Sequence, residues 1–223
     1  MRSVVRAVLV LALVTVGLVL AAPPAQADSF DFTSDHCTGG CGTTPFGTVT
    51  LTQSGTTVDI TVHLNNPNFF VHTNAGDDMA FKFNATGVVL TDITIDGHTP
   101  ALTAATGTFN GDGGGTFAFG IQCPSCAQAE PGKFNTDIVF HVANAVISDF
   151  LTPNDKGQIF VADIISCDVA HCGSGTGTGN TGLVDVSGGT TSVPEPATLV
   201  LLGTGLVGLA FVARQRWFSG RKS

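Results

Sequence analysis

Val58-Asp59-Ile60-Thr61-Val62-His63-Leu64 alternates apolar and polar side chains at every step. A period of two puts one set of side chains on a buried face and the other in water, which is the pattern of a half-buried β-strand. Residues 48–52 show the same alternation just before this run, and the segment 53–56 between them contains a glycine suited to a tight turn. The stretch 48–64 therefore predicts an antiparallel hairpin.

The same alternation returns along the rest of the chain. Further strands are predicted at residues 79–83, 89–95, 116–121, 138–142 and 159–165. No helical periodicity extends beyond a turn or two, although residues 145–151 fit either a short helix or a strand. About eight short strands with Gly-rich and Asn-rich turns predict an all-β domain, a β-sandwich that is jelly-roll-like.

The part of the chain between its two apolar ends is strongly acidic. It holds only Lys82, Lys133 and Lys156 against all 17 acidic residues of the chain, a net charge of −14. Such a surface cannot neutralise phosphates, so we expect no nucleic acid as a partner. It can attract cations or basic partners, and it keeps an exported protein soluble.

The first 27 residues predict a secretory signal peptide with its own short apolar helix. Its parts are a basic start at Arg2 and Arg6, an apolar core at residues 8–22, and a cleavage site marked by Ala25, Ala27 and Asp28. An uncleaved transmembrane helix is the alternative, which Pro23 and Pro24 disfavour. The secretion translocon and signal peptidase are the partners that this segment implies, and Asp28 is the expected first residue of the mature chain.

A second membrane-directed segment closes the chain at residues 193–223. Its parts are the triplet Pro194, Glu195 and Pro196, an uncharged run at 197–213, and a basic tail with Arg214, Arg216, Arg221 and Lys222. As a helix at ~1.5 Å per residue, the run spans about 26 Å, close to the roughly 30 Å core of a bilayer. Because basic flanks stay in the cytoplasm, we expect a transmembrane helix at 197–213 and the acidic domain outside.

The order of these three parts resembles the PEP-CTERM sorting signal of Gram-negative bacteria. By this resemblance, Pro194, Glu195 and Pro196 are the recognition element of exosortase, a membrane protease that cleaves near the triplet. The two prolines keep the segment extended and open to a protease. A plain C-terminal anchor is the alternative. Residues 70–76 and 147–165 are loosely similar to other exported proteins with this tail, which names no activity.

The predicted organisation has four parts: the signal peptide 1–27, a β-sandwich domain at 28–172, a Gly/Thr/Ser-rich tether at 173–192, and the sorting signal 193–223. The alternative for part of the tether is a last irregular strand at 183–186, with flexible chain before and after it. We expect the precursor to be anchored in the inner membrane and the product to reach the cell surface or the extracellular space.

Six cysteines lie in close pairs: Cys37 with Cys41, Cys123 with Cys126, and Cys167 with Cys172. An even count in an exported chain implies disulfides, and three local bridges are favoured although the sequence leaves the pairing open. The spacing of Cys123 and Cys126 also suits a redox motif, but no βαβ pattern supports it. A mixed zinc site is a further alternative, built from His36, Cys37, Cys41, Cys167, His171 and Cys172.

Catalytic templates are missing from the sequence, which has no G-x-S-x-G, no H-E-x-x-H and no P-loop. We expect no catalytic residue, no metal and no cofactor. The remaining histidines are expected to be solvated or hydrogen-bonded strand residues: His63, His72, His98 and His141. Asp77-Asp78 and residues 154–157 offer oxygen ligands for calcium, but turn chemistry explains both more simply.

The sequence therefore favours a non-enzymatic protein of the cell surface or extracellular matrix. By the resemblance, an association with biofilm and exopolysaccharide is implied. A carbohydrate-binding or adhesive module is the alternative, which the lack of Tyr and the position of the single Trp in the tail disfavour. A secreted hydrolase is a second alternative, because paired carboxylates among 17 acidic residues leave no signature in spacing.

Overall fold

The computed structural model describes residues 26–37, 40–71, 77–126, 132–167 and 180–187. The signal helix expected within residues 1–27 and the transmembrane helix expected at 197–213 lie outside the described residues, apart from the last residues of the signal. Within these ranges, no helix is long and apolar enough to cross a membrane. The described part is built from β-strands and short 3-10 helices, so the all-β prediction is confirmed.

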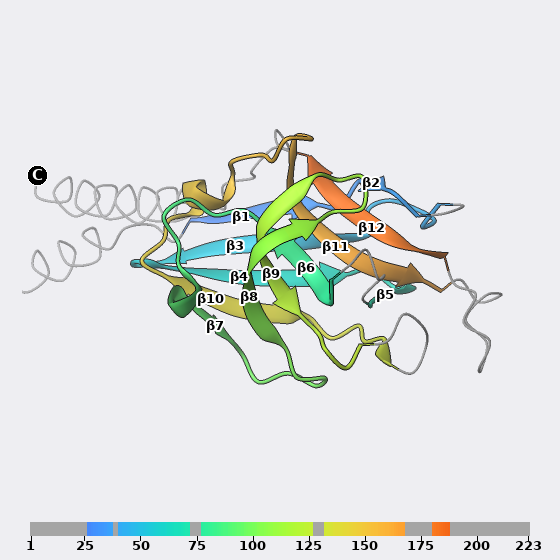
Figure 1. Ribbon diagram of the computed structural model, residues 1–223, viewed down its shortest axis with the longest axis horizontal. Coiled ribbons are helices and arrows are strands. Elements are labelled where there is room, and N and C mark those ends of the chain that lie inside the picture. The colour runs from blue at the N-terminus through green and yellow to red at the C-terminus, as the bar shows by residue number, and fades with distance from the viewer. Residues whose placement is uncertain (1–25, 38–39, 72–76, 127–131, 168–179, 188–223) are drawn as a thin grey trace, which may run out of the picture. The chain divides into compact units, whose positions relative to one another are not determined.

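The first sheet contains the predicted hairpin. Its strands, in spatial order, are β1 (Ala27–Asp31), β3 (Gly47–Ser54), β4 (Thr57–Leu64), β10 (Ile138–Ala143) and β7 (Ile93–Ile95). All neighbours are antiparallel. Strands β3 and β4 pair along their whole length, with Leu51 opposite Ile60, and the turn between them uses Gly55 at a φ of 62°. The stretch 48–64 therefore folds as predicted (Figure 1).

The second sheet takes in strands from both ends of the domain. Its main order is β2 (Ser34–Asp35), β12 (Asn180–Ser187), β11 (Gln158–Ser166), β6 (Met79–Phe83), β9 (Thr116–Gln122) and β8 (Thr103–Asn110), and β5 (Asn68–Phe70) also pairs with β11. The predicted Gly-rich tether contains β12, which pairs with β11 through most of its length. The strand considered at 183–186 is therefore real and longer than expected.

Two short 3-10 helices refine the predicted elements. η3 (Ile147–Phe150) settles the ambiguous segment 145–151 in favour of a short helix. η1 (Leu90–Asp92) replaces the first half of the strand predicted at 89–95, and only Ile93–Ile95 is extended as β7. The prediction of one long strand there was wrong because the carboxylate of Asp92 accepts a hydrogen bond from the Val89 N–H at 3.1 Å, which closes a turn.

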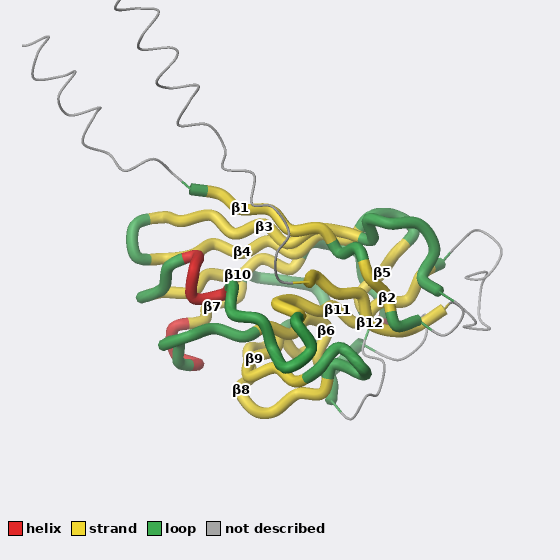
Figure 2. Tube along the Cα trace, turned by 90° about the horizontal axis from the view of Figure 1, so that it is seen from above, coloured by secondary structure: helices red, strands yellow, loops and turns green. Residues whose placement is uncertain are grey.

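Phenylalanine rings join the two sheets face to face. Phe30 of β1 lies 5.7 Å from Phe160 of β11, and Phe140 of β10 lies 5.4 Å from Phe83 of β6, measured between ring centroids. Figure 2 shows the sheets as two layers. The jelly-roll topology is not confirmed. A jelly roll is built from two Greek keys, whereas three pairs of consecutive strands form simple hairpins here: β3–β4 in the first sheet, and β8–β9 and β11–β12 in the second.

The two outer faces differ in their contact with water. The outer face of the first sheet is polar and partly exposed, as at Thr50, Asp59 and His63. The outer face of the second sheet is covered at its centre: strand β11 is buried on both sides from Ile159 to Ile165, whereas most of β8 is exposed. Phe117, Val161 and Leu183 form an apolar cluster there, outside the sandwich core. Charged side chains on this face are therefore held in a dry layer.

Candidate functional sites and the sorting motif

A lysine and two aspartates meet in the dry layer of the second sheet. Because Phe81 and Phe83 point into the core, Lys82 between them points the other way, and its side chain is 0% exposed. Its Nζ donates a hydrogen bond to Oδ1 of Asp163 at 3.2 Å, and Oδ1 of Asp77 lies 3.3 Å from the same Nζ. Asp163 is 1% exposed and Asp77 11% exposed.

The position of Asp77 is fixed by a turn before strand β6. Its Oδ1 accepts a hydrogen bond from the N–H of Met79 at 3.2 Å. Asp78, its partner in the calcium hypothesis, instead faces the side-chain amide of Gln122 at 3.5 Å. The carboxylates of Asp77 and Asp78 thus have different partners and do not point toward a common calcium position. This cluster was not predicted from the sequence, where its one local signal is a lysine flanked by Phe81 and Phe83.

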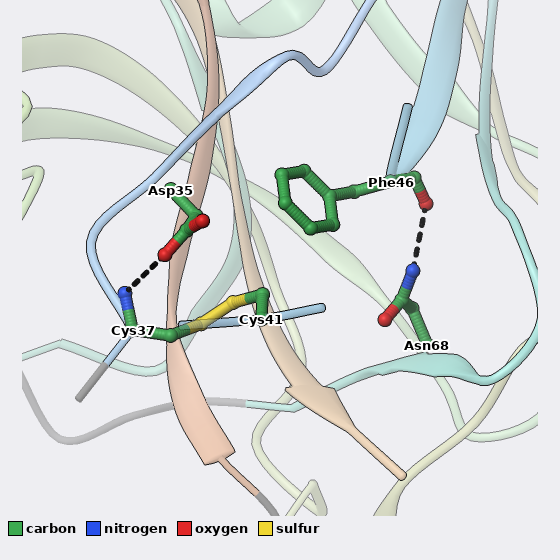
Figure 3. The surroundings of a disulfide bond; sticks show 5 residues. All are labelled: Asp35, Cys37, Cys41, Phe46 and Asn68. Carbon is green, nitrogen blue, oxygen red and sulfur yellow. Dashed lines mark hydrogen bonds between the residues drawn. A yellow bond between two sulfur atoms is a disulfide. The ribbon is translucent and has the colours of Figure 1, made fainter. Parts of the chain in front are cut away.

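Two of the predicted cysteine pairs are disulfides. The Cα atoms are 5.4 Å apart in Cys37–Cys41 and 5.3 Å apart in Cys123–Cys126, within the usual range. Figure 3 shows the first bridge beside Asp35, whose carboxylate accepts a hydrogen bond from the N–H of Cys37 at 3.2 Å. Cys167 is also disulfide-bonded, and Cys172, its predicted partner, lies outside the described residues.

The structure gathers only part of the residues of the zinc hypothesis. Asp35, Cys37 and Cys41 have potential ligand atoms within 4.8 Å of one another, but the two sulfurs are joined as a disulfide and are not thiolates. His36 turns elsewhere, with its Nε2 at 3.0 Å from the buried carboxylate of Asp185. His171 and Cys172 lie outside the described residues. The described part of this set therefore fits a structural bridge better than a metal.

The Cys123–Cys126 disulfide lies at the end of strand β9. Cys123 directly follows β9, and its N–H donates to the carbonyl of Asp78 at 2.9 Å. Both cysteines are buried, at 0% and 1% exposure. A catalytic thiol pair is partly exposed, whereas these two cysteines are buried.

His63, His98 and His141 are hydrogen-bonded residues on or beside strands, as predicted. His63 lies 2.7 Å from Asp137, and His98 lies 2.8 Å from both the carbonyl of Pro100 and the hydroxyl of Thr136. His72 lies outside the described residues. These contacts engage both ring nitrogens of His98 and the Nδ1 of His63.

His141 differs from the other histidines because two carboxylates flank its ring. Its Nδ1 lies 2.6 Å from Asp59 and its Nε2 lies 2.9 Å from Asp96. The hydrogen bond to Asp59, with the hydrogen bond and charge of Asp96, raises the pKa of His141 above its ordinary value of 6.5. Both nitrogens can donate only in the imidazolium form, so this arrangement favours the charged ring.

A polar hollow of about 270 Å³ opens at the edge of the second sheet. Strand β8 bulges between Thr106 and Phe109 where it pairs with β9. The N–H of Ala118 on β9 donates instead to Oδ1 of Asn84 at 2.8 Å. The residues that line the hollow include Asn84, Thr108, Thr116, Phe117, Asn154 and Asp155.

Asn154 and Asp155, which line this hollow, are held in place by hydrogen bonds. Oδ1 of Asn154 accepts from the N–H groups of Lys156 and Gln158 at 2.9 and 3.0 Å, and its Nδ2 donates to the carbonyl of Gly114 at 2.7 Å. Oδ1 of Asp155 accepts from the N–H of Thr116 at 3.2 Å. The segment 154–157 is thus a hydrogen-bonded turn, the simpler of the two readings made from sequence.

The expected signal-cleavage site lies partly in the described chain. Ala27 begins strand β1, and Asp28 is 3% exposed with one carboxylate oxygen that has no hydrogen-bond partner. Ala25 lies outside the described residues. The sorting and tail residues also lie outside them: Pro194, Glu195, Pro196, Arg214, Arg216, Arg221 and Lys222.

Comparison with protein families identifies the C-terminal segment. Residues 192–216 match the model of the PEP-CTERM protein-sorting motif. The chain carries a PEP-CTERM sorting motif. Searches of the curated proteins and of the solved structures gave no match.

The PEP-CTERM match covers the triplet, the whole apolar run and the first two arginines of the tail. The resemblance seen in the sequence is therefore confirmed. A PEP-CTERM motif indicates an exosortase-type membrane protease as partner and sorting of a secreted, membrane-anchored precursor to the cell surface.

Proposed function

We propose that this chain is a non-enzymatic structural protein of the cell surface or extracellular matrix, released from its membrane anchor by cleavage near Pro194–Pro196. The observation that carries the proposal is the PEP-CTERM match at residues 192–216. The charge of the chain supports it, because six of the nine basic residues lie at the two ends and the acidic residues lie between them. A role in the exopolysaccharide matrix or biofilm follows from the resemblance.

Recovery of the protein from its native host tests the cleavage. We expect the intact mass of the surface-associated protein to lack the signal peptide and the tail. A triple variant, Pro194→Ala, Glu195→Ala and Pro196→Ala, should keep the tail and stay in the membrane fraction. The double variant Thr190→Ala, Thr191→Ala is the matched control and should be processed normally. Wild-type protein that keeps its tail in a host with active exosortase would contradict the proposal.

Carbohydrate binding is a second candidate function, and the polar hollow beside β8 favours it. Its lining offers amide, hydroxyl and carboxylate groups and includes no basic side chain, which suits an uncharged polyol better than an anion. Only one carboxylate, that of Asp155, is among these lining residues, whereas glycoside hydrolysis commonly uses two. The proposal is therefore binding and not hydrolysis.

A glycan microarray probed with the full-length chain, in a detergent without a sugar headgroup, tests this second function. Thr108→Val removes a hydroxyl from the hollow, and we expect it to weaken binding of a neutral glycan about fivefold. Thr106→Val on the same strand is the control, because Thr106 is exposed and does not line the hollow. Equal binding by the two variants would remove the hollow from consideration.

A further inference from the structure

The cluster of Lys82, Asp163 and Asp77 has the composition needed for a condensation reaction. It contains a primary amine, a carboxyl group at hydrogen-bond distance from it, and a second carboxylate that touches the same nitrogen. We propose that Lys82 and Asp163 react to form an intramolecular isopeptide bond, with Asp77 as the catalytic residue that moves the proton. This proposal does not depend on the sorting of the chain or on carbohydrate binding.

Neighbouring strands hold the two reacting side chains on the same face of the sheet. In the ladder between β6 and β11, Lys82 lies opposite Val161, so Asp163 is the next residue of β11 on that face. On the side away from β11, Lys82 lies opposite Gly120 of β9, which has no side chain. A paired, buried sheet leaves both groups little freedom to move apart.

The reaction starts from an uncharged amine and a protonated carboxyl group, and the site that holds Lys82 and Asp163 is dry. Lys82 and Asp163 are almost completely buried, next to the apolar cluster of Phe117, Val161 and Leu183. Burying an ion pair costs several kcal/mol per ion in general, and transfer of a proton from Nζ to the carboxylate removes both charges. An uncharged amine has the free electron pair of a nucleophile, and a dry site protects the product from hydrolysis.

The chemistry balances without any added reactant. The electron pair of the uncharged Nζ of Lys82 attacks Cγ of the protonated carboxyl group of Asp163 and forms the new C–N bond. Asp77 accepts a proton from the nitrogen and delivers it to the departing hydroxyl group. The C–O bond breaks, one water molecule leaves, and Asp77 returns to its starting state. No atom is oxidised or reduced.

Such a bond would supply a long-range covalent link that the described disulfides do not. The two described bridges join residues 4 and 3 positions apart, whereas Lys82 and Asp163 are 81 positions apart. The entropy lost by an unfolded chain on cross-linking grows with loop length. The proposed bond would thus restrict the unfolded chain more than either of the two described bridges does.

Peptide mapping of the reduced full-length protein with trypsin gives a clear readout. Between Arg6 and Arg214, the chain has cleavage sites only at Lys82, Lys133 and Lys156. If Lys82 is bonded, cleavage after it fails, and the peptide ending at Lys133 stays joined to the peptide 157–214. The joined species should weigh one water molecule less than the sum of its parts. Complete cleavage after Lys82 in folded wild-type protein would overturn the proposal by itself.

Matched variants separate the roles of the three residues. Lys82→Arg keeps the charge and Asp163→Ala removes the acceptor, so both should lose the joined peptide. Asp77→Asn keeps an oxygen for the N–H of Met79 but is not a base, and it should slow bond formation at least tenfold after refolding. Lys133→Arg and Lys156→Arg should leave the bond intact. Bond formation at an unchanged rate in Asp77→Asn would overturn the catalytic role of Asp77.

Discussion

His141 shows how single residues on the wet face of the first sheet are tied together. Its ring lies between Asp59 on β4 and Asp96 after β7, so one imidazolium connects three neighbouring strands. The side chain is 38% exposed, and solvent therefore screens much of the attraction. The result is a modest contribution to stability with a clear dependence on pH.

This arrangement predicts a pH effect with a definite sign. Because the pKa of His141 is raised in the folded state, its stabilisation is fully present below the unfolded value of about 6.5 and is lost as the pH rises through the folded pKa. Urea denaturation should show His141→Gln less stable than wild type by up to about 1 kcal/mol at pH ~5, with the difference shrinking toward pH ~9.

Thr61→Val is a suitable control for this measurement, because Thr61 lies on the same face and does not titrate. Its effect on the free energy of unfolding should be independent of pH. A His141→Gln difference that grows as the pH rises would show that the imidazolium does not stabilise the fold.

Lys82 marks the limit of sequence reasoning at the residue scale. The alternation at 79–83 places Lys82 opposite the core side chains, and sequence alone therefore assigns it to water. The structure buries it, because the outer face of the second sheet is itself covered around Lys82. Which segments cover a sheet depends on long-range topology, and a local period of two contains no information on it.

At the scale of elements, the strands with clear alternation were predictable and the others were not. β3, β4, β6, β9, β10 and β11 follow from their period. β8 was missed because most of its residues are small or polar, at the edge of a sheet. β12 was predicted only in part, as an irregular strand at 183–186, because its Gly-rich surroundings are typical of a tether, although β11 pairs with it closely. In β8 and β12, pairing with a neighbouring strand produces an extended conformation although the local sequence favours a strand only weakly.

The hairpin of β3 and β4 depends on the absence of a side chain at Gly47. A Cβ there would collide with the carbonyl oxygen of His63 and lie 2.9 Å from Cα of Leu64, both of them backbone atoms. Gly47→Ala should therefore destabilise the fold by about 1–3 kcal/mol. Gly97→Ala is the control, because nothing lies within 4 Å of that position. Equal melting temperatures for the two variants would contradict this account.

Packing between the two sheets predicts a larger effect at Phe140. This residue is 0% exposed and contacts Phe81 and Phe83 of the opposite sheet. Phe140→Ala should lower the free energy of unfolding by about 3–5 kcal/mol, measured by chemical denaturation. Val139→Ala, on the outer face of the same strand, should cost much less. A similar cost at both positions would mean that the sheets do not pack through this ring.

At the scale of the whole molecule, the described covalent bridges are local. Each closes a very short loop, so the entropic model predicts a contribution of about 2 kcal/mol or less per bridge. We therefore expect the domain to remain folded in a thiol reductant, with a melting temperature lowered by a few degrees in calorimetry. Complete unfolding on reduction would show that the bridges, and not the Phe-rich core, hold the domain together.

The bulge in β8 has a consequence for a protein crowded at a surface. β8 is the last strand of its sheet, so its outer side offers backbone groups to any other extended chain. The irregular pairing between Thr106 and Phe109 interrupts the regular spacing of those groups. This irregularity therefore disfavours the addition of a strand from a neighbouring copy along this border.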